Sequence, residues 1–91
     1  MERPRIEAAL AAALEELAAI EHARWAHWQG YMHSKATRRT DGSLVIPADL
    51  AARWEKQIAT PYANLTETEK QSDRDQVQKY LPVIAEALTR V

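Results

Sequence analysis

The first thirty residues contain no helix-breaking residue between Pro4 and Gly30, and this run constrains the fold more than any other feature. It is rich in Ala, Leu and Glu, which are strong helix formers, and Pro4 suits the first turn of a helix. The pattern predicts a helix of about 25 residues or more, roughly 38 Å long, that ends or loosens between Gly30 and Lys35. One domain of 91 residues, spanning 1–91, needs less width than this, so part of the helix should project or pack on another copy.

The alanines of this helix allow two interpretations. Small side chains let two backbones approach closely, which favours a homodimer through the first helix. Alanine is also a good helix former on an exposed face, and that explanation is equally consistent with the alanines alone. For the chain as a whole we expect a homodimer through the first helix. The residues concerned are Ala8, Ala9, Ala11, Ala12, Ala13, Ala18 and Ala19.

One carboxylate lies within the apolar stripe of the predicted helix. Positions three and four apart share a helix face, so Glu21 lines up with Leu14 and Leu17 on one side and with Trp25 and Trp28 on the other. A core seldom accepts an unpaired carboxylate. Glu21 should therefore pair with a cation from elsewhere in the chain or lie at the edge of a pocket.

The remainder of the sequence predicts a hairpin and two further helices. Asp41-Gly42 lies between short β-capable runs, which is a strong hairpin signal. A second helix should follow Pro47, with Leu50, Trp54 and Ile58 on one face. Thr66 and Glu69 form a capping box for a third helix, which Pro82 should kink or restart. The expected fold is mainly α with a short β-hairpin, three to four helices and a long N-terminal helix.

Composition excludes several classes of function. Twelve basic and thirteen acidic residues give a formal net charge of -1, so nucleic-acid binding is not expected. The chain has no cysteine, which removes disulfides and thiolate chemistry and makes the cytoplasm the default location. Glutamates interrupt the Ala- and Leu-rich run, so we expect neither a signal peptide nor a membrane span.

Catalytic and metal-binding patterns are also missing from the sequence. His22, His27 and His33 are five and six residues apart, whereas ligands on one helix face need a spacing of three or four. No nucleophile elbow, Walker loop or glycine-rich dinucleotide turn occurs. We therefore expect no metal, no cofactor and no enzymatic activity.

Charged residues occupy the predicted core-facing side of the third helix in its first turns. These residues are Lys70, Asp73 and Arg74. Together they are natural partners for Glu21, because an ion-pair network that joins them would hold the third helix against the first. Alternatively, aromatic rings and cations together form a site for a nucleotide-type ligand. The rings would come from Trp25, Trp28 and Tyr62, and the cations from Arg24, Lys70 and Arg74.

A basic cluster of Lys35, Arg38 and Arg39 lies on the first arm of the predicted hairpin. Charged residues at this position usually guard a strand edge against pairing with another chain. A second anion contact, or nucleic-acid binding, is the alternative. We favour the strand-edge interpretation.

The chain resembles the ryanodine-receptor-type (RyR) domain, in its small bacterial and phage versions, from Leu17 to Leu88. The resemblance rests on His22-x-x-Trp25, on the block Pro61-Tyr62-x-x-Leu65-x-x-x-Glu69-Lys70-x-x-Asp73-Arg74, and on Tyr80-Leu81-Pro82. The Pro-Tyr to Asp-Arg block is fairly specific, whereas His-x-x-Trp alone is weak. The chain departs from the family pattern in having Gly30-Tyr31 where Gly-Trp is usual, and an extra helix with Trp54 between Pro47 and Pro61. These departures affect the expected pocket more than the fold.

The resemblance implies a non-enzymatic domain that recognises nucleotide or ADP-ribose-type molecules, cyclic ones included. It points to His22, Trp25, Tyr62, Glu69, Lys70, Asp73 and Arg74. In a phage, such a module would be a sponge that sequesters an immune signal. Joined with the residues argued above, the predicted ligand site is Glu21, His22, Arg24, Trp25, Trp28, Tyr62, Lys70, Asp73 and Arg74. The alternative is a structural or protein-interaction domain in which this aromatic and ionic cluster is only core.

Overall fold

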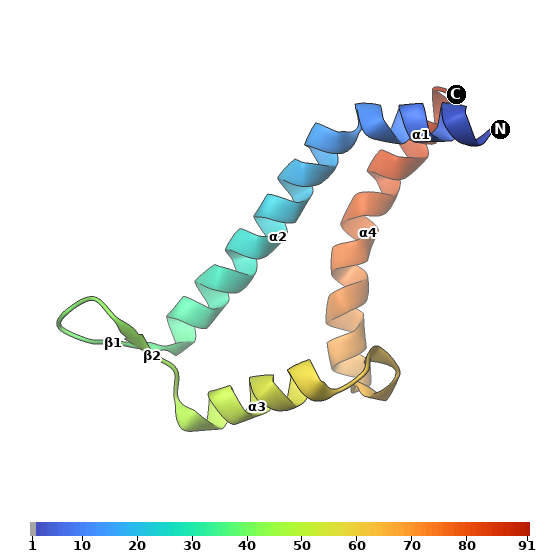
Figure 1. Cartoon of the computed structure of the whole chain (residues 1–91). Helices are drawn as coiled ribbons and strands as arrows, with labels where there is room; N and C mark the ends of the chain where they lie inside the picture. Colours follow the sequence, from blue (N-terminus) through green and yellow to red (C-terminus); the bar gives the residue numbers. More distant parts are fainter. Residues whose placement is uncertain (1) are drawn as a thin grey trace.

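The computed structural model describes residues 2–91 as four α-helices and one two-stranded hairpin (Figure 1). The predicted fold class, mainly α with a short hairpin and a long helical N-terminal region, is confirmed. The elements are α1 (Arg3–Ala12), α2 (Leu14–Lys35), β1 (Thr37–Arg38), β2 (Leu44–Val45), α3 (Ala48–Ala59), a short 3-10 helix (Tyr62–Asn64) and α4 (Glu67–Thr89).

The helical N-terminal region is divided at Ala13, where α1 meets α2. The Ala13 N–H donates to the carbonyl oxygen of Leu10 at 3.0 Å, a tighter turn than an α-helix makes. Helix α1 crosses the C-terminal end of α4 (Figure 1), and Ala13, which follows α1, is only 6% exposed. From there α2 continues through Gly30 and ends at Lys35, within the predicted limits. A single glycine costs a helix about 1 kcal/mol, which is too little to end one of this length.

The predicted capping box begins α4. Thr66 accepts a hydrogen bond from the Glu69 N–H at 3.2 Å, and the Glu69 carboxylate accepts one from the Thr66 N–H at 3.0 Å. The helix then runs without interruption through Pro82, so the predicted restart does not occur. Pro82 has no N–H, so the carbonyl of Gln78 loses its hydrogen bond within the helix. Because Gln78 is exposed, water can take the place of the missing donor.

The hairpin forms at the predicted Asp41-Gly42 turn. Thr37 pairs with Val45 and Arg38 with Leu44 in antiparallel register. Gly42 has a φ of 88°, a conformation that favours glycine. The Asp41 carboxylate accepts hydrogen bonds from the Ser43 N–H at 2.9 Å and from its hydroxyl at 2.6 Å, which fixes the turn.

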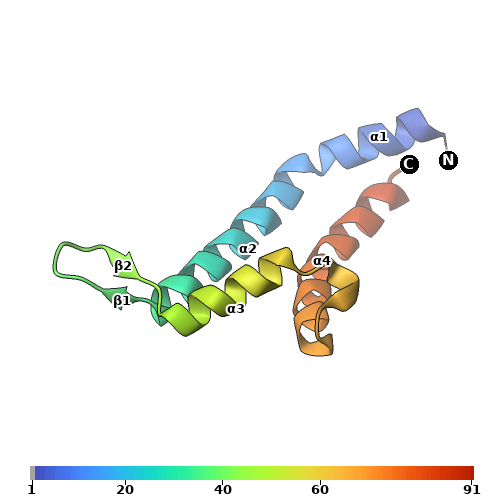
Figure 2. The ribbon, with the colours of Figure 1, turned by 60° about the horizontal axis from the view of Figure 1, so that its bottom comes forward.

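Helices α2, α3 and α4 lie along three sides of an open frame (Figure 1), and the hairpin projects from the end of α2 (Figure 2). The radius of gyration of the protein is 18.0 Å, whereas a compact chain of this length has one of about 12 Å. The accessible surface is 7192 Å², against about 5,400 Å² expected for a compact 10.3 kDa protein. Among residues 2–91 only Ala13 and Ala87 are buried apolar side chains. The chain by itself therefore has no core of large apolar residues.

Candidate functional site

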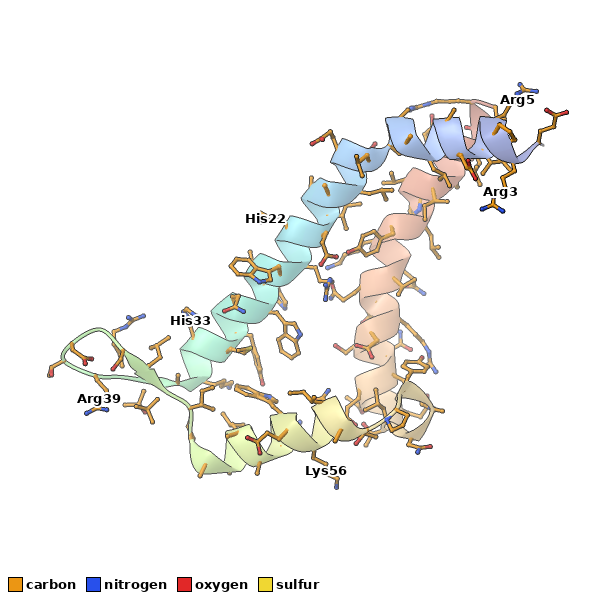
Figure 3. All side chains as sticks on the ribbon, viewed as in Figure 1. Arg3, Arg5, His22, His33, Arg39 and Lys56 are labelled. Atoms are coloured by element: carbon orange, nitrogen blue, oxygen red, sulfur yellow. The ribbon has the colours of Figure 1, made fainter. Side chains whose placement is uncertain are left out.

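A cavity of about 600 Å³ lies between α2, α3 and α4. This size falls within the range of small-molecule sites. Side chains of α2, α3 and α4 project into the space between these helices (Figure 3). The residues of the cavity are Glu21, Arg24, His27, Trp28 and Tyr31 from α2, Arg53, Trp54 and Gln57 from α3, and Thr68, Glu69, Ser72, Asp73, Gln76, Val77 and Tyr80 from α4.

Three aromatic rings form one wall of this cavity and connect α2 to α3. The ring centroids of Trp28 and Tyr31 are 5.4 Å apart, and those of Tyr31 and Trp54 are 6.4 Å apart. Both pairs are tilted, a favourable arrangement for aromatic rings. Trp28 and Tyr31 lie three residues apart on one helix face and remain partly exposed. The wall therefore offers flat apolar surface to a molecule in the cavity.

Glu21 is the centre of a hydrogen-bond network that joins α2 to α4. Arg24 holds its carboxylate with two donors, Nε to Oε2 at 3.1 Å and Nη2 to Oε1, and the Tyr80 hydroxyl also donates to Oε2. The Arg24 guanidinium, and after it the Tyr80 hydroxyl, lower the pKa of Glu21 to about 2. The same bonds raise the pKa of Arg24, and the Glu21 carboxylate raises the pKa of Tyr80.

Among the side-chain hydrogen bonds of residues 2–91, the bond from Tyr80 to Glu21 joins the two most distant positions of the sequence. This bond spans 59 positions, and every other side-chain hydrogen bond in that range spans seven or fewer. Because both groups are solvent accessible, the link orients the two helices more than it stabilises them.

Contrary to the prediction, Lys70 and Arg74 do not pair with Glu21. Both lie beside Glu67 instead, at 3.7 Å from the Lys70 Nζ and 3.3 Å from the Arg74 Nη1. Glu21 is level with Tyr80, which lies about 15 Å further along α4 than Lys70. The expected ion pair is therefore too far away to form, and Glu21 uses Arg24 of its own helix.

The nine predicted site residues fall into three groups. Glu21, Arg24, Trp28 and Asp73 lie together in the cavity. His22 and Trp25 stack on each other with centroids 6.0 Å apart, and His22 points away from the interior of the frame (Figure 3). Tyr62, Lys70 and Arg74 form a third group at the start of α4, where the Lys70 Nζ lies 5.8 Å from the centroid of the Tyr62 ring. The hydrogen bond with Glu67 raises the pKa of Arg74, and Tyr62 raises it to a smaller extent.

Sequence reasoning missed four important residues of the cavity: Tyr31, Arg53, Trp54 and Tyr80. Tyr31 could have been found, because it lies three residues after Trp28 on the same face. Arg53 and Tyr80 gave no signal, since only the packing of α3 and α4 against α2 brings them to the cavity. Within the described chain Arg53 has no salt-bridge partner.

A second cavity of about 660 Å³ adjoins the first, because Trp28, Trp54, Gln57 and Asp73 border both. One part of its lining is mostly apolar and comes from α2, α3, the segment after β2 and the residues before α4. We call this part the apolar groove. It consists of Met32, Ile46, Ile58, Tyr62 and Leu65.

Neither a metal centre nor a membrane span is found in the part of the chain that the structure describes. Residues 2–91 contain no group of three or more metal-binding side chains placed to hold an ion. No helix in this range combines the length and apolar character needed to cross a bilayer. Comparison with known protein families, characterised proteins and solved structures finds no match.

Proposed function

We propose that this chain is a small module that captures a nucleotide or ADP-ribose-type molecule, cyclic forms included, in the cavity between α2, α3 and α4, without turnover. The observation that carries the proposal is the aromatic wall of Trp28, Tyr31 and Trp54, with Arg53 in the same cavity. Flat rings stack on a base, and a guanidinium binds phosphate with two parallel hydrogen bonds. The resemblance to RyR domains supports the same ligand class.

The charges in the cavity narrow this ligand class further. Its lining has two arginines against three carboxylates, which disfavours a polyphosphate. Arg24 neutralises Glu21, and the Glu69 carboxylate accepts a hydrogen bond from the Thr66 N–H at the start of α4. Arg53 and Asp73 are therefore the charged side chains that can bind a ligand. A carboxylate is a good acceptor for the hydroxyls of a ribose. A ligand with one or two phosphate groups and a sugar diol, such as AMP or ADP-ribose, therefore fits the cavity better than a triphosphate.

Capture by such a module would lower the free concentration of its ligand. If the chain comes from a phage, the role that follows is that of a sponge for an immune signal. We also propose that two copies of the chain form the functional unit, because one copy leaves its large apolar side chains uncovered.

Isothermal titration calorimetry with ADP-ribose, AMP, adenosine and pyrophosphate tests the proposal. We expect ADP-ribose or AMP to bind more tightly than adenosine or pyrophosphate, because only the first two combine phosphate, sugar and base. Arg53→Ala should weaken binding about tenfold or more, since a hydrogen bond to a charged group is lost. Lys56→Ala is the matched control, because Lys56 lies on the same helix and points away from the frame (Figure 3).

The aromatic wall has its own matched pair. Trp28→Ala should abolish binding, whereas Trp25→Ala should leave it unchanged, because Trp25 does not border the cavity. Equal effects of the two changes would contradict a site in this cavity.

A protein-interaction domain is the second candidate function. The observation that favours it is the exposure of ten large apolar side chains, which is unusual for a chain that acts alone. The two functions differ in the titrations described above. If none of the four probes binds at millimolar concentration, the interaction domain becomes the better account.

A further inference from the structure

We propose that a second copy of this chain packs against the apolar groove, so that the interface of the homodimer lies on α3 and not on the alanine-rich face of α1. This inference rests on the proposed homodimer and names its surface. The occupant of the groove is argued from the area that the chain leaves exposed, from the face of α3, and from charge.

The exposed area matches what an obligate dimer needs. The chain exposes about 1,800 Å² more than a compact protein of its mass would. Burial of that excess on each of two copies removes about 3,600 Å² in total, which lies within the range of obligate homodimers. A chain whose only buried apolar residues in 2–91 are two alanines gains its core through this contact.

The face of α3 shows where the contact lies. Leu50, Trp54 and Ile58 follow one another at a spacing of four, so they form one apolar stripe along the helix. Leu50 and Trp54 are half-buried, whereas Ile58 is 84% exposed, the most exposed large apolar side chain in residues 2–91. The stripe thus leads out of the chain into the apolar groove, where Ile58 has no apolar cover.

The alanines of α1 and α2 are a weaker candidate for the interface. Ala13 is only 6% exposed within one copy, and α1 already contacts α4, on which Ala87 is 2% exposed. Close approach through small side chains is therefore realised inside one copy.

The chain itself carries an apolar side chain that would fill the groove of another copy. Leu81 on α4 is more than half exposed and borders neither cavity of its own copy, so it is free to form an apolar ridge that enters the groove of another copy. In a two-fold dimer each copy offers the same surfaces to the other, so one ridge and one groove form two contacts. A net charge of -1 on each copy opposes this association only weakly.

Sedimentation equilibrium of the full chain tests the surface, with Ile58→Glu as the variant and Ala52→Glu as its control. Ala52 is exposed on the opposite face of α3, so both changes place a glutamate on the same helix. We expect a particle of twice 10.3 kDa for the wild type and for Ala52→Glu. We expect Ile58→Glu to raise the dimer dissociation constant at least 100-fold.

Thermal unfolding at several protein concentrations keeps the test decisive if Ile58→Glu does not fold. The midpoint of the wild type should rise with concentration, because folding and association are coupled. A folded 10.3 kDa wild-type monomer with a constant midpoint would overturn both the homodimer and its surface, as would a chain that stays unfolded at every concentration.

The outcomes also distinguish three proposals: the apolar groove as the interface, the homodimer, and ligand capture. If Ile58→Glu forms a dimer with the same dissociation constant as the wild type, the groove is not the interface, but the homodimer itself is not refuted. Failure of all nucleotide probes, together with dissociation of Ile58→Glu, would refute ligand capture alone.

Discussion

Thr66→Ala is expected to destabilise the chain through the start of α4. The threonine hydroxyl oxygen accepts a hydrogen bond from the Glu69 N–H at 3.2 Å, one of the N–H groups that have no partner within the helix. Loss of such a cap costs about 1 kcal/mol, with a range of roughly 0.5–2 kcal/mol. In a domain of this size about 1 kcal/mol lowers the unfolding midpoint by roughly 4–8 °C. Circular dichroism at 222 nm, at one fixed protein concentration, measures the shift.

Two controls separate the cap from a general effect of substitution. Thr66→Ser keeps the hydroxyl and should leave the midpoint within experimental error of the wild type. Glu69→Gln keeps an acceptor for the Thr66 N–H, which lies at 3.0 Å from the carboxylate, and should lower the midpoint less than Thr66→Ala. A midpoint for Thr66→Ala equal to that of the wild type would refute the reasoning, as would an equal loss in Thr66→Ser.

Three further predictions concern the contacts of α4, two of them with α2 and one with α1. The pKa of Glu21 is lowered from 4.5 to about 2, so this carboxylate stabilises the fold above pH 4.5, and its contribution is lost as the pH falls toward 2. NMR titration of the carboxyl group should give a pKa of about 2, and Arg24→Ala should raise that pKa. The pKa of Tyr80 is raised above 10, so its ultraviolet titration should move to lower pH in Glu21→Gln. Ala87→Leu should destabilise by about 1–3 kcal/mol in thermal unfolding through overpacking, and an unchanged midpoint would contradict the crossing of α1 over α4.

The helices and the hairpin could be predicted because local sequence determines them. The capping box at Thr66 and the Asp41-Gly42 turn depend on groups only two or three residues apart. The division between α1 and α2 could not be predicted, because Ala13 is as good a helix former as its neighbours. The turn lets α1 leave the direction of α2 and contact α4, and no local pattern encodes this contact between segments far apart in the sequence.

The candidate site was only partly accessible from the sequence, for the same reason. Arg24 lies three residues after Glu21, and helical spacing alone could have identified it as the partner. Tyr80 could not have been found, because it lies 59 positions away and only the angle between α2 and α4 brings it near. Helical spacing predicts which residues share a face of α4 but not which of them lie level with Glu21, and Lys70 and Arg74 lie beside Glu67 instead.

The position of α3 connects the two proposals, because this helix belongs to both surfaces. Arg53 lines the first cavity, where we propose that the ligand binds, Ile58 belongs to the apolar groove, and Trp54 borders both cavities. A second copy on Ile58 would hold α3 in place, and α3 in turn fixes Trp54 beside Tyr31, where the ring centroids are 6.4 Å apart. Ligand and second copy then favour the same position of α3, so each raises the affinity of the other by an equal factor. Dilution of the protein below its dimer dissociation constant should accordingly weaken ligand binding, and an affinity independent of dilution would show that the cavity is complete in one copy.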